Sequence, residues 1–191
     1  MKGKTTVRKN GQLFEKMDIL KHFFEEPEKE FHLREIARLS RLAPSTASKH
    51  LSNMAKSELL ILRSDKGFSL FRSNTENTVY RDFKLFYNLL KIRNCGLIDF
   101  LAEEFNHPKC ILLFGSFRKG ENSKGSDIDI FIETPSKKET DVSKFEKALG
   151  HSIHLLQFSS SEIELMKTKN KEMLNSIING ISLYGYFEVF K

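Results

Sequence analysis

The fold of the second half of the chain is decided by residues 114–130, which read FGSFRKGENSKGSDIDI. The apolar run Cys110–Phe114 ends at this stretch and is typical of a buried strand. A glycine followed by a serine at the end of such a strand lets the backbone approach a phosphate closely and adds a hydroxyl and an N–H. Gly115 and Ser116 are therefore candidate contacts for the phosphates of a nucleotide.

A gap of ten residues, 117–126, separates Ser116 from the first of two aspartates. Asp127 and Asp129 are predicted on one strand, where residues two apart project from the same face, while Ile128 and Ile130 point into the core. Two carboxylates side by side repel each other unless a cation lies between them, and Mg²⁺ (or Mn²⁺) prefers such hard oxygen ligands. Asp127 and Asp129 are thus the candidate metal ligands and catalytic residues for displacement of pyrophosphate from a nucleoside triphosphate. The alternative is a solvent-facing edge strand behind a polar turn.

The remainder of this half predicts several further strands and helices. Leu97–Phe105 has helical spacing, and Ser159 with Glu162 forms a potential capping box. The other expected elements are strands at 128–133 and 153–158 and helices near 141–149 and 170–179.

The glycine-serine pair, the ten-residue gap and the Asp-x-Asp pair resemble the signature of the minimal nucleotidyltransferases in the DNA polymerase beta superfamily, over roughly residues 97–186. The resemblance implies a small mixed sheet flanked by helices. It also implies a metal ion on both aspartates, triphosphate contacts from Gly115 and Ser116, and further nucleotide contacts from Lys119 and Ser126. Lys119 stands where relatives usually have arginine. The position therefore keeps its positive charge but lacks the forked hydrogen-bonding geometry of a guanidinium group.

The third carboxylate of active relatives is missing from its expected place. His154 occupies that place on the strand at 153–158, and histidine is a poor ligand for Mg²⁺. Two roles remain open for it: a base near neutral pH, or a strand residue hydrogen-bonded to a neighbour. Asp141 and Glu146, on the preceding helix, would substitute only with unusual geometry.

In the first half, the predicted order is helix, short strand, helix, turn, helix and hairpin. The helices are expected at 12–26, at 33–40 and from Pro44 onward, with Ala47, Leu51 and Met54 on one face. The strands are Phe31-His32, 60–63 and 68–72, with a turn at 65–67. Asn74 or Thr75 is expected to cap a connector helix that ends near Arg93 and faces inward with Val79, Phe83, Phe86 and Leu90.

Residues 12–72 resemble the winged-helix domains of bacterial and archaeal transcription regulators, chiefly in HLREIARL at 32–39 and APSTASKHLS at 43–52. Relatives usually have serine at the cap where this chain has Ala43, so the cap should be weaker. The resemblance implies DNA contacts from the start of the recognition helix and from the wing. Those residues are Ser45, Thr46, Ser48, Lys49, Arg63, Lys66 and Arg72.

Charge is divided unequally between the halves. Residues 1–72 hold 15 Lys and Arg against 9 Asp and Glu, whereas the remainder holds 16 of each, so the formal net charge of +6 comes from the first part. This asymmetry favours a basic module that binds a polyanion, with a solvated basic face as the alternative. The two cysteines have no other potential metal ligands near them in the sequence, which predicts reduced thiols. The sequence shows no apolar membrane span and no signal sequence, so we expect a cytoplasmic protein.

The chain is expected to be an α+β protein of four segments: a basic tail (1–11), a winged helix-turn-helix domain (12–73), a connector helix (74–96) and a nucleotidyltransferase-like domain (97–191). This arrangement resembles an archaeal family with the same two domains, and the run at 177–185 fits that family.

The first functional hypothesis is a DNA-binding enzyme that transfers a nucleoside monophosphate, from ATP, to a hydroxyl of a protein or small molecule. The resemblance to minimal nucleotidyltransferases also implies a possible antitoxin role, because members of that group often modify a helical toxin. DNA binding would then fit autoregulation of an operon. The second is a transcription regulator that senses nucleotide without turnover, and a third is a scaffold. The expected partners are double-stranded DNA, a nucleoside triphosphate, a helical toxin and a second copy of the chain, with no membrane.

Overall fold

The computed structural model describes residues 16–65, 67–135 and 137–189. The predicted basic tail, the start of the first helix and Lys66 lie outside these residues. The chain divides into two compact units, Met1–Arg81 and Asp82–Lys191, and the boundary falls inside helix α4 (Thr78–Asn94). Each unit is described by itself.

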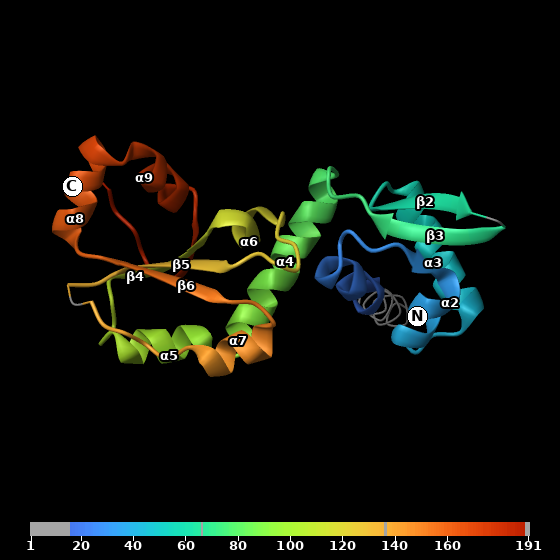
Figure 1. The fold of residues 1–191 in the computed structure, drawn as a ribbon, viewed down its shortest axis with the longest axis horizontal. Coiled ribbons are helices and arrows are strands. Elements are labelled where there is room, and N and C mark those ends of the chain that lie inside the picture. Colours follow the sequence, from blue (N-terminus) through green and yellow to red (C-terminus); the bar gives the residue numbers. More distant parts are fainter. Residues whose placement is uncertain (1–15, 66, 136, 190–191) are drawn as a thin grey trace, which may run out of the picture. The chain divides into compact units, whose positions relative to one another are not determined.

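The first unit has the predicted order of helices and strands (Figure 1). A helix over residues 16–25 is followed by β1 (Phe31–His32), α2 (Leu33–Leu39), α3 (Pro44–Lys56), β2 (Leu60–Asp65) and β3 (Phe68–Ser73). The three strands form an antiparallel sheet in the order β1-β3-β2. Pro44 occupies the first turn of α3 as expected, and Ala43 provides no side-chain cap.

The core of this unit lies between its helices and its sheet. Ala47, Leu51 and Met54 are buried on one face of α3, which confirms the predicted face. Phe23, from the first helix, contacts Phe31 of β1 edge to face, with ring centroids 5.0 Å apart. Apolar burial by these helices and strands is the main favourable contribution to the stability of the unit.

Helix α4 corrects two expectations. It begins at Thr78, and the Asn77 side chain caps it by accepting a hydrogen bond from the Tyr80 N–H, so neither Asn74 nor Thr75 is the cap. The predicted inward face is also wrong, because Val79, Phe86 and Leu90 are 51%, 52% and 40% exposed. The residues of α4 that are buried are Tyr80, Lys84, Asn88 and Ile92.

The second unit is built on a four-stranded sheet in the order β6-β5-β4-β7. Strand β5 runs antiparallel to β4 and parallel to β6, while β7 runs antiparallel to β4. Its elements after α4 are α5 (Leu97–Glu104), β4 (Cys110–Phe114), α6 (Gly115–Lys119), β5 (Ile128–Glu133), α7 (Ser143–Leu149), β6 (Ile153–Phe158), α8 (Ser160–Lys169), α9 (Lys171–Ile178) and β7 (Ile181–Gly185).

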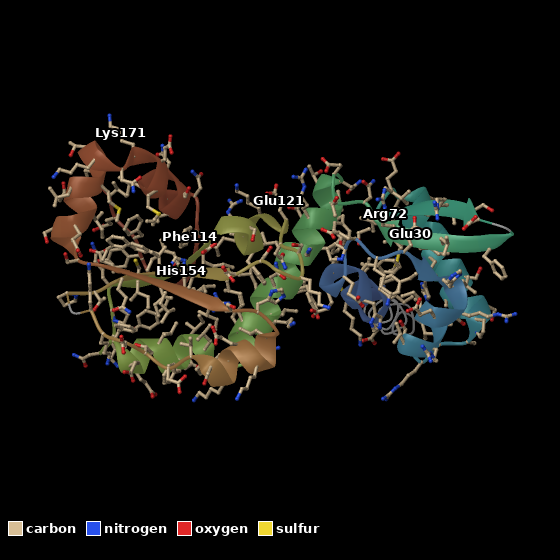
Figure 2. All side chains as sticks on the ribbon, viewed as in Figure 1. Glu30, Arg72, Phe114, Glu121, His154 and Lys171 are labelled. Atoms are coloured by element: carbon tan, nitrogen blue, oxygen red, sulfur yellow. The ribbon has the colours of Figure 1, made fainter. Side chains whose placement is uncertain are left out.

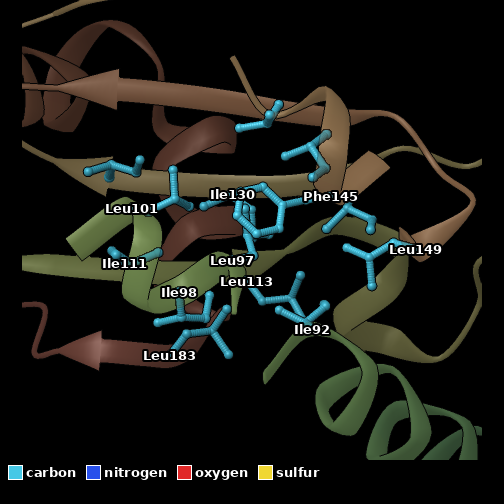
Figure 3. Packing of buried hydrophobic residues seen from close by; sticks show 14 of the residues in the cluster. Ile92, Leu97, Ile98, Leu101, Ile111, Leu113, Ile130, Phe145, Leu149 and Leu183 are labelled. Atoms are coloured by element: carbon cyan, nitrogen blue, oxygen red, sulfur yellow. The ribbon is translucent and has the colours of Figure 1, made fainter. Parts of the chain in front are cut away.

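The sheet is covered on both faces. Ile111, Leu113 and Ile130 belong to a core formed with α5 and α7 (Figure 3). Alternate residues of the same strands, such as Leu112 and Phe131, belong to a second core formed with α8 and α9 (Figure 1). Because successive strand residues point to opposite faces, the continuous apolar run of β4 supplies both cores.

Two elements of this unit were not anticipated. No helix was expected directly after Phe114, but Gly115–Lys119 form the short helix α6, which ends at Gly120 with φ 67°. The run at 181–185 forms β7 at the edge of the sheet. The predicted capping box is present, since Ser159 accepts from the Glu162 N–H and Glu162 accepts from the Ser159 N–H.

Candidate functional site

Asp129 lies at the centre of the candidate site. In the register of the sheet it stands between Phe114 of β4 and His154 of β6, which lie close together in Figure 2. It shares its face of β5 with Phe131, which packs toward α8 and α9, whereas Ile128 and Ile130 point into the opposite core as expected. The sheet therefore fixes the position of the Asp129 carboxylate at the end of β4, where α6 begins.

Gly115 is required at this position by the close approach of Asp129. Its φ is +71°, a backbone conformation that L side chains rarely adopt, and a Cβ added there would collide with the Asp129 carboxylate. The glycine-serine turn and the Asp-x-Asp segment, separate in sequence, are thus in direct contact. This contact brings the backbone expected to bind phosphates to the carboxylate expected to bind a metal ion.

The electrostatics of Asp129 suit a cation. Burial raises the pKa of its carboxyl, and the neighbouring Asp127 raises it further, while His154 opposes the shift. His154 Nδ1 lies 3.5 Å from Asp129 Oδ1, and the Asp129 side chain is 27% exposed. A divalent ion would stabilise the ionised carboxylate that burial disfavours.

Asp127 is placed differently from the expectation. It lies in the loop immediately before β5, which begins at Ile128, and it is exposed. The two aspartates supply hard oxygen ligands of the kind that Mg²⁺ prefers, together with waters and substrate phosphates. Within residues 16–65, 67–135 and 137–189, no group of three or more His, Cys, Asp or Glu side chains is arranged to hold a metal ion. An ion held by Asp127 and Asp129 would therefore need further ligands, such as waters or substrate phosphates.

Three further predicted nucleotide contacts lie in α6 and the loop that follows it. Ser116 lies half-buried and Lys119 exposed in α6. The Ser126 hydroxyl accepts from the Ser123 N–H at 2.9 Å, and the Ser126 carbonyl accepts from His151 Nδ1 at 2.8 Å. Ser126 therefore also shapes the loop before Asp127.

Asp141 and Glu146 have structural partners elsewhere. Asp141 accepts from the Ser143 N–H at 3.0 Å at the start of α7, which lowers the pKa of its carboxyl. Glu146 accepts from the Ile153 N–H at 2.9 Å and so holds the beginning of β6. His154 is the residue that faces Asp129 in register, at the position expected for a third acid.

Sequence reasoning missed a buried polar cluster behind the loop: Lys84, Asn88 and Asn122. Asn88 donates to the Asn122 side chain, and Lys84 donates to the Asn122 carbonyl. The only signal in the sequence was the spacing of Tyr80, Lys84, Asn88 and Ile92 at four-residue intervals, which the neighbouring apolar residues of α4 obscured.

Apart from Lys66, which lies outside the described residues, the residues expected to contact DNA lie on α3 and on the strands β2 and β3. Ser45 and Lys49 are exposed on α3, while Thr46 and Ser48 are half-buried. The sequence of α3 contains no acidic residue. Its exposed surface therefore combines hydroxyl groups and positive charge.

The two arginines of the hairpin differ in their surroundings. Arg72 is exposed on β3. Arg63 on β2 forms an ion pair with Glu30, with Arg63 Nη2 2.9 Å from Glu30 Oε2, and lies 3.9 Å from Asp65 Oδ2. These carboxylates offset the positive charge of Arg63, which leaves Arg72 as the better placed of the two for a phosphate.

The fold and the site together define a domain that places a glycine turn against a carboxylate on a mixed sheet. A family model described as a nucleotidyltransferase domain matches residues 95–181, so the second unit contains a nucleotidyltransferase domain. No curated protein and no solved structure matches the chain. Among the helices that the structure describes, none is long and apolar enough to cross a membrane.

Proposed function

We propose that this protein is a DNA-binding nucleotidyltransferase that transfers a nucleoside monophosphate from a nucleoside triphosphate, ATP, to a hydroxyl group of a protein or small molecule. The observation that carries the proposal is the contact between Gly115 and the Asp129 carboxylate. It brings a backbone turn suited to phosphates next to a carboxylate suited to Mg²⁺ or Mn²⁺.

Each part of the site has a role in this reaction. Gly115 and Ser116 would bind the triphosphate, with Lys119 as a nearby cation, and Asp127 and Asp129 would hold the metal ion. The bond from the acceptor oxygen to the α-phosphorus forms as the bond to the β-phosphate oxygen breaks, and pyrophosphate leaves with that electron pair. A bound divalent ion supplies neutralisation of the charge on the phosphates.

The proton of the acceptor hydroxyl needs a base. His154 is suited to this role because its side chain is 60% exposed and lies directly beside Asp129 on the neighbouring strand. A neutral imidazole nitrogen can act as the general base that accepts this proton. The 3.5 Å separation of His154 Nδ1 from Asp129 Oδ1 keeps the imidazole next to the site.

The test is transfer of label from α-labelled ATP, with Mg²⁺ or Mn²⁺, to candidate protein acceptors and small-molecule hydroxyls. Asp129→Asn should reduce transfer by about 100-fold or more, because a preorganised electrostatic interaction is lost. Asp141→Asn, which changes an exposed carboxylate at the start of α7, is the matched control. Absence of transfer to every acceptor, or an unchanged rate in Asp129→Asn, contradicts the proposal.

DNA binding by the first unit is the second part of the proposal. The acid-free α3 with exposed Ser45 and Lys49, and the net charge of +6 in residues 1–72, support it. The arrangement of β1, α2, α3, β2 and β3 supports a winged helix-turn-helix, in which α3 would enter the major groove and Arg72 would contact the backbone. Such a protein could regulate its own operon and modify a helical toxin, and a second copy would read a second half-site.

A non-catalytic nucleotide sensor is the alternative function. It is favoured by one observation: His154, not a third carboxylate, faces Asp129. In that case DNA affinity changes when ATP and Mg²⁺ bind, while ATP remains intact. Measuring operator binding and ATP hydrolysis or transfer in the same samples distinguishes the sensor from the enzyme.

A further inference from the structure

The buried polar cluster of Lys84, Asn88 and Asn122 lies within the second unit, against the loop that carries the nucleotidyltransferase motif. The three residues are 1%, 4% and 4% exposed. Lys84 and Asn88 are one turn apart on α4 and therefore share a face. Burying an amide and an ammonium group is costly unless their hydrogen bonds are made. The side chains of Lys84 and Asn88 therefore need hydrogen-bond acceptors inside the unit.

The acceptors are Phe117 and Asn122, which lie at the two ends of the segment 117–122. Asn88 Nδ2 donates to the Phe117 carbonyl at 3.0 Å and to Asn122 Oδ1 at 2.8 Å. Lys84 Nζ donates to the Asn122 carbonyl. Phe117 lies in α6 directly after Ser116, and Asn122 lies in the loop between α6 and β5. One side chain of α4 thus ties the helix that carries Ser116 to the loop that leads to Asp127.

The far half of the loop has its own support. His151, just before β6, donates to the Ser126 carbonyl and contacts the Phe117 ring edge to face, with centroids 4.8 Å apart. The loop is therefore held from α4 at Asn122 and from the β6 side at Ser126. Between these supports the loop closes on itself, because the Ser126 N–H donates to the Ser123 carbonyl at 3.1 Å. The contacts from α4 and from His151 therefore anchor the two sides of a hydrogen-bonded turn.

We infer that Lys84, Asn88 and Asn122 are positioning residues, which hold the segment 116–127 in the geometry that binds the triphosphate and the metal ion. The inference rests on the proposed function for the identity of the ligand. None of the three needs to touch the ligand, because they act through the backbone carbonyls of Phe117 and Asn122. Pre-organisation of this kind lowers the cost of ordering the loop when the nucleotide binds.

The test compares full-length variants in two measurements. Asn88→Ala and Lys84→Met remove the contacts from α4, and Asn122→Ala removes the side-chain acceptor from the loop without changing α4. Lys91→Met is the matched control, since Lys91 also lies on α4 and donates Nζ to a backbone carbonyl, that of Leu149, away from the loop. Far-ultraviolet circular dichroism verifies that each variant is folded.

The first measurement is amide hydrogen exchange across residues 116–127 without ligand. The cluster variants should exchange there about 10-fold faster, while Lys91→Met stays at the wild-type rate in this segment. The second is the Kd for a fluorescent ATP analogue with Mg²⁺, expected to rise about 10-fold in the cluster variants only. Rescue by Asn88→Gln of part of the affinity would argue for hydrogen bonding rather than packing.

Failure of the inference and failure of the proposed function give different results. If the wild-type protein binds no Mg²⁺-ATP, the proposed function is overturned, and exchange alone then decides whether the cluster holds the loop. Wild-type exchange across 116–127 in folded Asn88→Ala and Asn122→Ala overturns the inference. So does an equal change in Kd for Lys91→Met, because the effect would then belong to α4 as a whole.

Discussion

Asp129 and His154 are direct partners across the parallel strands β5 and β6, with His154 Nδ1 3.5 Å from Asp129 Oδ1. The register places the position at which a third acid was expected on β6, directly beside the half-buried carboxylate of Asp129. An imidazole there interacts with Asp129 without a metal ion, whereas a carboxylate would repel it. The identity of residue 154 therefore determines how strongly the site depends on a cation.

His154→Asp should make the protein depend more strongly on Mg²⁺. Without the ion, like charges directly opposite each other should lower the free energy of unfolding by roughly 0.2–1 kcal/mol. With millimolar Mg²⁺ the loss should be recovered, because a third carboxylate adds a ligand. Thermal unfolding with and without Mg²⁺ measures both effects, and His154→Asn controls for loss of the imidazole. An Mg²⁺ response in His154→Asp equal to that in His154→Asn would contradict the prediction.

Gly115→Ala should disrupt the site more than the backbone conformation alone requires. Gly150 is the matched control, because its φ of +75° is similar to the +71° of Gly115 while a Cβ at Gly150 meets nothing within 4 Å. Gly150→Ala should cost about 1–2 kcal/mol of stability from strain. Gly115→Ala should cost a further 1–3 kcal/mol or so from overpacking against Asp129, and should weaken Mn²⁺ binding. Urea unfolding and Mn²⁺ titration give the two quantities, and equal losses in both variants would exclude the clash.

Much of the second unit follows from its apolar runs. The predicted bounds of β4, β5 and β6 match the structure. The continuous apolar run of β4 is typical of a buried strand, whereas β5 and β6 interrupt their apolar residues with polar ones. The buried face of α4 was predicted wrongly, since Phe86 and Leu90 recur at the same helical period as Lys84 and Asn88. Burial of the polar pair depends on carbonyls more than twenty residues away, which local periodicity does not contain. The contact of Gly115 with Asp129 likewise arises only when β4 and β5 pair.

Glu162 should contribute stability that disappears in acid. A hydrogen bond from Lys137, together with those from the Ser159 N–H and hydroxyl, lowers the pKa of its carboxyl to about 2 from 4.5. Because the pKa is depressed in the fold, this contribution is present above pH 4.5 and is lost as the pH falls toward about 2. Glu162→Gln keeps a capping side chain but removes the charge. Its urea midpoint should lie below that of the wild type at neutral pH, and the gap should narrow as the pH falls below about 4.5.

Glu164→Gln provides the control for that experiment. It removes the ion pair with Lys167 on the same helix, where Lys167 Nζ lies 2.7 Å from Glu164 Oε1, but it leaves the contacts of Glu162 in place. Exposed pairs three residues apart contribute little, so its urea midpoint should remain close to that of the wild type. A gap between Glu162→Gln and the wild type that is constant from neutral pH to about pH 3 would show that the charge of Glu162 has no part in it.

Lys49→Ala should weaken binding to duplex DNA and reduce its salt dependence. Lys49 is exposed on α3, and loss of one phosphate contact lowers the slope of log K against log salt by about 1. Lys21→Ala is the control, because Lys21 also belongs to the first unit but lies outside α3 and pairs with Asp18, 3.1 Å away. Fluorescence anisotropy at several salt concentrations gives the slope for each variant. If Lys21→Ala and Lys49→Ala change the slope equally, the basic charge of the unit acts diffusely, and α3 is not the surface that faces DNA.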